Sequence, residues 1–291
     1  MAKVLIIGAS GTVGSQVVKE LDANHENVTV RLATSRASVA EQWRQEGKEA
    51  VVLDLENPQT YTAALNGIER VFLLTGYTAA MLYQSKRLVD AAEAAGVKFI
   101  VHLGVYSSGQ DEIPHYGWHD MVETYIKASK LAWTNLHPNV ILDSLLVTEP
   151  SVIEKGSFDV MWGDAALGWV SAADIGTVAA TVLREGPEKH NGADYYLSPE
   201  VVTGTQAAGI VTKATGIEVK CNIRGSESLI PYVKSIPDAG TRLYMESAVQ
   251  TMRLGESGQM RYQSMVHDDF QTVMGRPATT LYDWARQNLS R

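Results

Sequence analysis

Three glycines spaced three residues apart, Gly8, Gly11 and Gly14, constrain this chain more than any other feature. They follow a short apolar run at 4–7 and precede a segment, 17–21, whose apolar residues recur at helical spacing. A glycine loop between a buried strand and a helix allows the backbone to approach a pyrophosphate at the helix N-terminus. The spacing is G-x-x-G-x-x-G rather than G-x-G-x-x-G, and a glycine-rich turn without a ligand is the alternative. We expect the loop to contact a dinucleotide cofactor through Gly8, Ser10, Gly11, Thr12, Val13 and Gly14.

The first half of the chain alternates between apolar strand-like runs and segments of helical period. Runs typical of buried strands recur at 28–33, 50–53, 71–74 and 99–103, and helical patterns lie between them at 39–43, 58–65 and 81–95. Repeated strand–helix alternation is typical of a parallel sheet covered by helices on both faces. The sequence therefore predicts an α/β fold, a Rossmann-like doubly wound parallel sheet.

After about residue 150 the pattern becomes less regular. Helical patterns occur at 172–183, 205–215 and 241–252, with a strand-like run at 195–197. We expect an NAD(P)-binding domain over 1–150 and a smaller, irregular α+β lobe over 151–291 that binds the substrate. The helix at 172–184 is expected to return to the first domain.

Composition excludes several classes of protein. The chain has 291 residues and a net charge of −8, and it contains no Lys/Arg cluster of the kind that binds nucleic acid. Its apolar runs fall far short of the ~20 residues that a membrane span needs, and the N-terminus lacks a signal-peptide pattern. The single cysteine, Cys221, cannot form an internal disulfide, which fits a reducing compartment. We expect a globular, cytoplasmic protein with no nucleic-acid or membrane partner.

The residues after the second strand predict which nucleotide binds. An acidic residue about 20 positions past the glycine loop would bind the ribose 2′-hydroxyl of NAD. No carboxylate occurs between Glu26 and Glu41, and Ser35 and Arg36 stand there instead. A guanidinium suits a 2′-phosphate, so NADP(H) is favoured over NAD(H), with a solvated loop charge as the alternative for Arg36. Asp54, after the third strand, is expected to bind the adenine amino group or to be an ordinary turn residue.

Further motifs lie at 133–139, Trp-Thr-Asn-Leu-His-Pro-Asn, and between Trp162 and Ile175. With these motifs, the glycine loop and the strand pattern, the chain resembles the NmrA-like group of atypical short-chain dehydrogenases/reductases, and most of all its branch of bacterial quinone and triphenylmethane reductases. The resemblance implies a Rossmann-like lobe, a small C-terminal lobe and NADP(H) in the cleft. It also implies either a reductase or a redox-sensing regulator that binds the nucleotide without turnover. The chain departs from its relatives at His137, where they often have the arginine of Leu-Arg-Pro-Asn.

The segment His115-x-x-x-His119-x-x-x-Glu123 stands where typical short-chain dehydrogenases have the Tyr-x-x-x-Lys pair that transfers protons. Tyr116 is followed four residues later by Asp120 rather than by lysine, which argues against epimerase or ordinary alcohol-dehydrogenase chemistry. The two histidines and Glu123 share one helical face, and the matching reductases have a histidine at the His119 position and an acid at the Glu123 position. We expect His119 to be catalytic, orienting a carbonyl or supplying a proton, with a packed or surface histidine as the alternative. Glu123 is expected to be structural.

The same spacing raises the question of zinc, because two histidines four residues apart are part of the H-E-x-x-H motif. The residues between His115 and His119 are Tyr-Gly-Trp, which lack the glutamate base, and Gly117 weakens the helix. No cysteine pair or further histidine cluster stands nearby in the sequence. We therefore expect no bound metal.

Residues that follow strand ends are candidate ligand contacts, because open α/β sheets bind ligands there. Thr75 and Gly76 follow the fourth strand and are expected to contact the cofactor. Aromatic side chains suit a flat substrate, although each of them also fits core packing. The expected substrate contacts are Tyr77, Tyr106, Trp118, Asn139 and Trp162.

These expectations leave three hypotheses. The first is an NADPH-dependent reductase of a flat conjugated acceptor such as a quinone or dye, because hydride transfer to such an acceptor needs little acid–base help. The second is an NADP(H)-sensing regulatory protein without turnover. The third, a sugar-nucleotide epimerase or dehydratase, is disfavoured by the lost tyrosine. The expected partner is a small aromatic or quinone-like substrate, and a homodimer is a further possibility.

Overall fold

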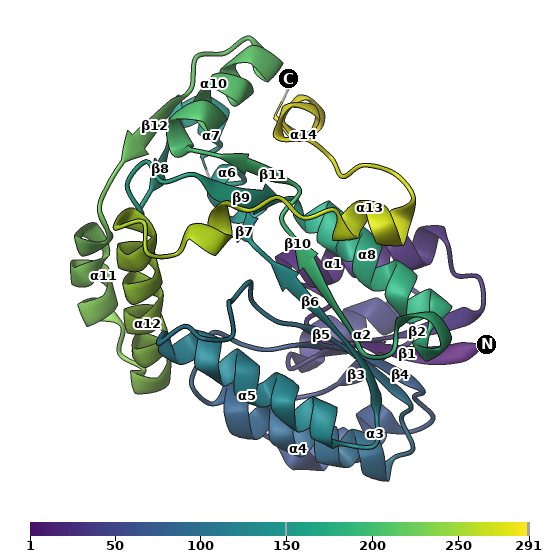
Figure 1. The fold of residues 1–291 in the computed structure, drawn as a ribbon. Coiled ribbons are helices and arrows are strands. Elements are labelled where there is room, and N and C mark those ends of the chain that lie inside the picture. Colours follow the sequence, from purple (N-terminus) through teal and green to yellow (C-terminus); the bar gives the residue numbers. More distant parts are fainter. Residues whose placement is uncertain (149, 290–291) are drawn as a thin grey trace.

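A parallel β-sheet lies at the centre of the protein (Figure 1). The computed structural model describes residues 1–148 and 150–289, and seven strands in these ranges form the sheet in the order β10-β6-β5-β4-β1-β2-β3, all parallel. The strands are β1 (Ala2–Ile6), β2 (Val28–Thr34), β3 (Ala50–Val52), β4 (Arg70–Leu74), β5 (Phe99–Leu103), β6 (Ala132–Pro138) and β10 (Ala193–Leu197). Strands β2 and β3 lie on one side of β1, and β4 and the later strands lie on the other, so the strand order reverses between β1 and β4. Open α/β sheets bind ligands at such a reversal. The predicted Rossmann-like doubly wound sheet is confirmed.

Helices cover both faces of this sheet. On β1, Val4 and Ile6 point into one apolar core and Leu5 and Ile7 into the other, which explains why the strand is a continuous apolar run. The helices of this part are α1 (Thr12–Ala23), α2 (Ala37–Gln45), α3 (Tyr61–Leu65), which follows the 3-10 turn η1 (Pro58–Thr60), α4 (Met81–Ala94), α5 (Pro114–Ala128) and α8 (Ala172–Glu185). Helices α1 and α8 share the first core, whereas α3, α4 and α5 share the second.

Helix α8 packs along α1, although it lies beyond residue 150. A Cβ atom on Gly176 would lie 2.6 Å from Cβ of Gln16, so a glycine is needed for this close approach. Strand β10 also follows residue 150 and pairs with β6 at the edge of the central sheet.

Helix α9 (Pro187–His190) packs against α8 and β6, and α13 (Asp269–Met274) packs against α8 and β10. The other elements form a second lobe with a separate apolar core. In the described ranges its strands pair as a three-stranded sheet, β11 (Glu200–Val202), β9 (Leu167–Val170) and β7 (Val140–Ile141), and as the pair β12 (Lys220–Ile223) and β8 (Ser157–Val160). Its helices and 3-10 turns are α6 (Asp143–Leu146), α7 (Val152–Lys155), α10 (Gly204–Thr215), η2 (Ser226–Leu229), α11 (Ile230–Ser235), α12 (Ala239–Glu256), η3 (Arg261–Ser264) and α14 (Leu281–Asn288). Helix α12 runs up to the start of α5 and so joins the two lobes beside the carboxyl edge of the sheet (Figure 1).

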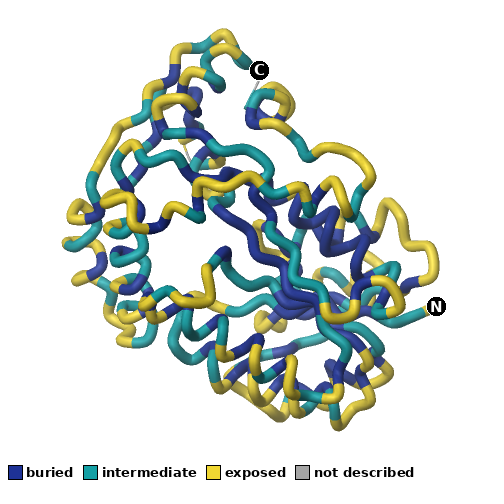
Figure 2. Tube along the Cα trace, in the orientation of Figure 1, coloured by how far each residue is buried: buried dark blue, intermediate teal, exposed yellow. Residues whose placement is uncertain are grey.

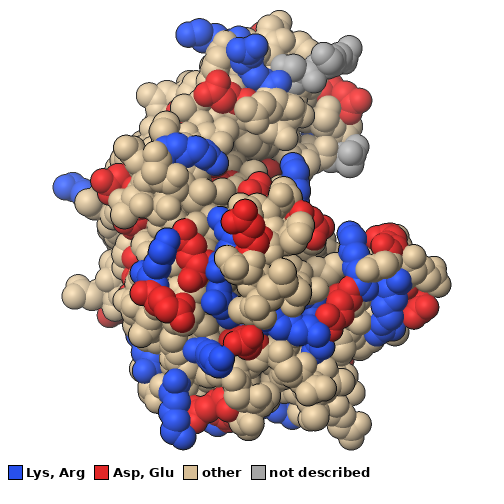
Figure 3. Space-filling view, turned by 90° about the vertical axis from the view of Figure 1, so that its right-hand side faces the viewer, with Lys and Arg blue, Asp and Glu red and all other residues tan. Residues whose placement is uncertain are grey.

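Burial and charge follow this arrangement. The middle strands of the central sheet, β1, β4, β5 and β6, and helix α8 are mostly buried (Figure 2). On the face shown in Figure 3, acidic and basic side chains are interspersed. Within the described residues, none of the helices combines the length and the apolar character that crossing a bilayer requires.

Candidate functional site

The glycine loop has the geometry of an anion-binding turn. Gly8 has a φ of 72°, in the left-handed region that favours glycine, and a Cβ atom on Gly14 would lie 2.1 Å from the Gly8 carbonyl oxygen. Gly11 is the N-cap residue of α1, and because it has no side chain it cannot cap the first amides of the helix. Ser10 and Thr12 are exposed beside these amides. A phosphate group can therefore approach the first turn of α1.

The end of β2 brings a guanidinium to this loop. Arg36 is exposed, and its Nη2 donates to Ser10 Oγ over 3.2 Å, so the loop and the β2 end meet at one place. The other arginine nearby, Arg31, is held by Glu49, with 2.6 Å between Nη2 and Oε1. Of these two arginines, Arg36 is therefore the one whose guanidinium can turn toward a 2′-phosphate. The exposed Ser35 precedes it in the chain.

The other predicted cofactor contacts follow β3 and β4. Asp54 is partly buried, and its Oδ1 accepts from the Glu56 amide over 3.0 Å, which is a turn contact. Thr75 and Gly76 follow β4 at the carboxyl edge of the sheet. The next residue, Tyr77, is 72% exposed, and the edge of its ring packs against Tyr244 of α12 with centroids 5.3 Å apart.

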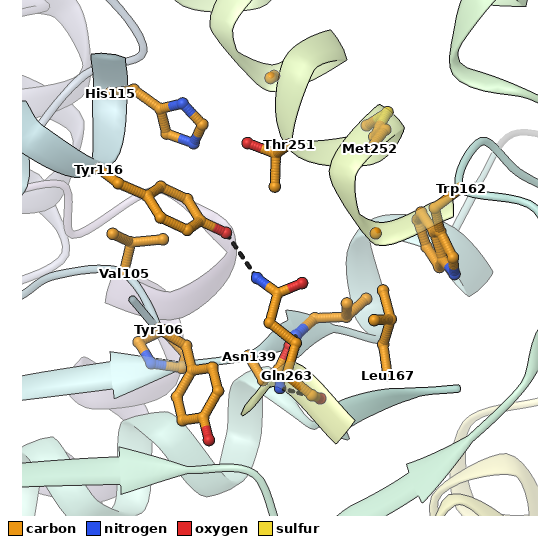
Figure 4. Close-up of a pocket in the computed structure, with 14 residues that line it drawn as sticks. Val105, Tyr106, His115, Tyr116, Asn139, Trp162, Leu167, Thr251, Met252 and Gln263 are labelled. Atoms are coloured by element: carbon orange, nitrogen blue, oxygen red, sulfur yellow. Dashed lines mark hydrogen bonds between the residues drawn. The ribbon is translucent and has the colours of Figure 1, made fainter. Parts of the chain in front are cut away.

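A cavity of about 210 Å³ lies over the carboxyl ends of β5 and β6 (Figure 4). Of the predicted substrate contacts, Tyr106, Asn139 and Trp162 line it, whereas Tyr77 and Trp118 do not. Its other lining residues come from the loop after β5, the start of α5, the β6–β7 segment, the second lobe, α12 and η3; they are Val105, His115, Tyr116, Pro138, Val140, Leu167, Ala248, Thr251, Met252, Gly255 and Gln263.

Two neighbouring side chains of α5, Tyr116 and His115, bring hydrogen-bonding groups to this largely apolar cavity. Gln263 Nε2 donates to the Tyr116 hydroxyl over 2.7 Å, which leaves the Tyr116 proton available, and Asn139 Nδ2 holds the Gln263 carbonyl over 2.9 Å. Burial raises the pKa of Tyr116, so the hydroxyl stays protonated. Ser247 Oγ accepts from the His115 amide over 3.0 Å and shares a second hydrogen bond of 2.7 Å with His115 Nδ1, whose direction depends on the imidazole tautomer. Burial lowers the pKa of His115 to about 4, so the ring is neutral.

The aromatic walls are fixed by their own contacts. Tyr106 donates its hydroxyl proton to the Tyr262 carbonyl or to His267 Nε2, at 3.0 and 2.7 Å. Trp162 is buried and packs edge-on against Trp169. Trp118 belongs instead to the core under α4 and α5, although its ring also approaches Tyr244.

His119, the expected catalytic residue, lies one helical turn beyond His115 and is 7% exposed. Its ring centroid is 5.6 Å from that of His102, a fully buried residue of β5. Neither ring nitrogen of His102 nor Nδ1 of His119 has a hydrogen-bond partner among the described residues. Burial lowers the pKa of His102 to about 3 and that of His119 well below its ordinary value, so both rings are neutral.

Glu123 and His137 extend this buried group. Glu123 Oε1 lies 3.8 Å from Nδ1 of His102 and 3.7 Å from Nδ1 of His137. Burial raises the pKa of Glu123 to about 7. Burial alone would lower the pKa of His137, but the hydrogen bond to Asp194 and the charge of Glu123 raise it. The surroundings of His137 thus favour its cationic form.

The side chains around Glu123 and His137 are poorly suited to bind a metal ion. Glu123, His137 and Asp194 are the one group of histidine and acidic residues in the described ranges whose potential ligand atoms lie within 4.8 Å of one another. However, Nδ1 of His137 donates to the Val105 carbonyl over 3.0 Å, and its Nε2 lies 3.1 Å from Asp194 Oδ1. Lys127 lies 3.3 Å from the same carboxylate. Both nitrogens and the carboxylate are thus engaged in an ion-pair network, and the absence of a metal stays a prediction.

Sequence reasoning missed part of this site. Tyr116 could have been found from its place on the helix of His115 and His119, but the segments of Thr251 and Gln263 give no local signal. His102 and His137 lie on strands that bring them beside α5 only in the folded sheet.

The strand order, the glycine loop and the cavity at the carboxyl edge define a nucleotide-binding α/β protein. The chain belongs to the NmrA-like family, whose sequence model matches residues 1–283, and the resemblance seen in the sequence is confirmed. It is 26% identical over 290 residues to the NAD(P)H azoreductase of Xenophilus azovorans, covering 97% of this chain and 96% of that one. It is 25% identical over 285 residues to quinone oxidoreductase 2 of Escherichia coli, covering 96% of each. The Citrobacter sp. triphenylmethane reductase complexed with NADP(H) has the same fold, with a TM-score of 0.79, 22% identity and 99% of each chain covered.

Proposed function

We propose that the protein is an NADPH-dependent reductase that transfers hydride to a flat conjugated acceptor such as a quinone or dye. The observation that carries the proposal is the apolar cavity with aromatic walls at the carboxyl ends of β5 and β6, on the edge of the sheet that holds the glycine loop. Relatives that match over the whole chain are an azoreductase and a quinone oxidoreductase, which supports this acceptor class.

The residues for the cofactor fit NADP(H). The first turn of α1 would hold the pyrophosphate, and Arg36 with Ser10 and Ser35 would hold the 2′-phosphate. Thr75 and Gly76, which follow β4, would contact the nicotinamide half. When bound, the reduced nicotinamide supplies the hydride.

The cavity suits a small planar acceptor. Pockets for drug-sized ligands are about 300–1,000 Å³, so the cavity of about 210 Å³ fits a one- or two-ring compound. Tyr106 and Trp162 provide apolar walls, while Tyr116 and His115 offer hydrogen bonds to an acceptor oxygen that gains negative charge. His119 lies one turn further along α5 and does not itself line the cavity; in this proposal it supplies, from beside the cavity, the proton that completes the reduction.

The test is NADPH oxidation across quinones, azo and triphenylmethane dyes, and enones. His119→Ala should lower kcat by about 10²–10⁴ while changing NADPH affinity little, because the residue acts on the proton. Tyr116→Phe should lower kcat through the lost hydrogen bond. Tyr125→Phe is the matched control, since this hydroxyl lies on the same helix but bonds to Asp90. Tight NADPH binding without oxidation of any acceptor would place the protein among the nucleotide-sensing regulators instead.

A further inference from the structure

A row of titratable side chains lies beside the cavity. Four of the seven histidines belong to it, from β5, α5 and β6, together with one glutamate of α5; they are His102, His115, His119, His137 and Glu123. The row abuts the cavity because one of its members, His115, lines it. Two other lining residues touch His137: the Val105 carbonyl accepts from its ring, and Pro138 follows it in the chain.

The contacts within the row are ordered. From the surface inward, Asp194 Oδ1 is 3.1 Å from Nε2 of His137, and Nδ1 of His137 is 3.7 Å from Glu123 Oε1. Glu123 Oε1 is 3.8 Å from Nδ1 of His102, and the His102 ring stacks obliquely near the His119 ring at 5.6 Å. The Asp194 side chain is 30% exposed, so one end of the row reaches solvent.

The inner part of the row is unusual because its nitrogens have no hydrogen-bond partners. Fully buried polar atoms without partners are rare in native proteins and are costly to keep. Both nitrogens of His102 and Nδ1 of His119 are in this state among the described residues. Such atoms call for an explanation, such as a catalytic role or a water that bridges them, and a bridging water would also let neighbouring groups exchange protons.

The backbone also makes room for the carboxyl group. A Cβ atom on Gly104, which directly follows β5, would lie 2.6 Å from Glu123 Oε1 and 3.4 Å from the His102 ring. A glycine at this position thus permits Glu123 to lie between His102 and His137.

We propose that Glu123, His102 and His119 form a buried proton relay that delivers a proton to the substrate site after each hydride transfer, and that His137 and Asp194 reload it from solvent. This inference rests on the proposed reductase function. Glu123 and His102 touch no substrate and act through His119.

Each cycle transfers one hydride and one proton to the acceptor. Hydride leaves the reduced nicotinamide with two electrons, and the reduced acceptor holds a negative oxygen. That oxygen takes a proton from His119, which receives one from His102 on its other nitrogen, and His102 receives one from Glu123. Neither imidazole becomes an anion, because each gains a proton as it loses one. The net donor is the Glu123 carboxylic acid, which solvent then reprotonates through Asp194 and His137.

Glu123 is suited to store this proton. Burial raises its pKa to about 7, so it exchanges a proton near neutral pH, while His102 and His119 remain neutral. The titratable and charged groups that face Glu123 are His102 of β5, His137 of β6, Asp194 and Tyr196 of β10, and Asp120 and Lys127 of α5. Of these, His137 and Lys127 favour the carboxylate and Asp194 and Asp120 favour the acid, which keeps the balance near neutrality.

The experiment compares Glu123→Gln with wild type in kcat, NADPH affinity and two isotope effects. We expect kcat to fall roughly 10- to 100-fold, less than for loss of a direct general acid because water can replace a relay. NADPH affinity should stay within about twofold. The wild-type kcat should fall as pH rises through about 7, where Glu123 loses its proton, and the variant should lose this limb.

The isotope effects separate a relay from a structural role. In Glu123→Gln proton delivery becomes slow, so the solvent deuterium effect on kcat should rise and the effect of 4-deuterated NADPH should fall. Glu123→Asp keeps an acid and should restore part of the rate and the pH limb. Asp120→Asn is the control, because it removes a half-buried carboxylate of the same helix that bonds to Ser107. It should leave both isotope effects unchanged and only shift the pH limb to lower pH, because the charge of Asp120 favours the acid form of Glu123.

His102→Asn repeats the test with Glu123 in place, and it carries the test if Glu123→Gln does not fold. A reductase whose pH profile and isotope effects are unchanged in a folded Glu123→Gln or His102→Asn variant overturns the relay and leaves the proposed function standing. No NADPH oxidation by wild type with any acceptor overturns the proposed function and the relay with it.

Discussion

Replacing Arg36 by alanine should remove the preference for NADPH over NADH. The guanidinium lies at the end of β2 and contacts Ser10 of the glycine loop, the two places that a 2′-phosphate would touch. A hydrogen bond to a charged group contributes about 1.5–3 kcal/mol. Arg36 is exposed, so solvent and salt screen the contact and the lower end applies, about 1.5 kcal/mol or tenfold in affinity.

Isothermal titration with NADPH and NADH at low and moderate salt measures this directly. Wild type should bind NADPH about tenfold more tightly than NADH, and Arg36→Ala should bring NADPH down to the NADH value while NADH affinity stays the same. Arg44→Ala is the control, because this arginine lies on the neighbouring helix α2 and pairs with Glu41. Equal affinities in wild type, or an equal loss of both nucleotides in Arg36→Ala, would refute the reasoning.

Three further outcomes are expected. Gly11→Val should abolish NADPH binding, measured by fluorescence titration. It should cost little stability, because a Cβ there meets one atom, the Gly8 carbonyl oxygen at 3.3 Å; unchanged affinity would show that the loop is only a turn. Gly176→Ala should lower the melting temperature by several degrees, since its Cβ would clash with the Gln16 backbone and overpacking costs about 1–3 kcal/mol; an unchanged melting temperature would show that α1 and α8 separate easily. Glu123 has a pKa raised from 4.5 to about 7, so the folded state binds the extra proton and stability falls as pH rises between these values. The free energy of unfolding of Glu123→Gln minus that of wild type, measured by denaturation, should therefore be about 2–3 kcal/mol larger at about pH 8 than at about pH 5. A difference between the two proteins that does not vary with pH would contradict this.

The sheet could be predicted because its strands carry their signal locally. The runs at 4–7 and 71–74 are apolar throughout, those at 28–33 and 99–103 are interrupted only by Thr29, Arg31 and His102, and the structure has strands at all four places. The strand at 132–138 was missed for the opposite reason. Its Thr134, Asn135 and His137 are buried but polar, and their partners lie on neighbouring elements.

The candidate site divides in the same way. The glycine loop is local, and its geometry agrees with the expected turn. The cavity is not local, because Thr251 and Gln263 reach it from more than a hundred residues beyond Tyr116. The roles of His119, Tyr77 and Trp118, and likewise the homodimer and the cytoplasmic location, stay predictions.

The buried polar stripe beside the cavity shows why such a group escapes sequence reasoning and why it is kept. Strand register places His102 beside Asn135 and Asn135 beside Asp194, so a polar stripe crosses three strands that are far apart in the chain. An apolar residue at the position of His102 would remove two unpartnered nitrogens from the core, and it should stabilise the protein. A side chain that lowers stability in the folded state persists where function needs it. A stable but slow His102→Leu variant would therefore fit a stripe that carries protons, whereas a destabilised one would show that the histidine holds the strands together.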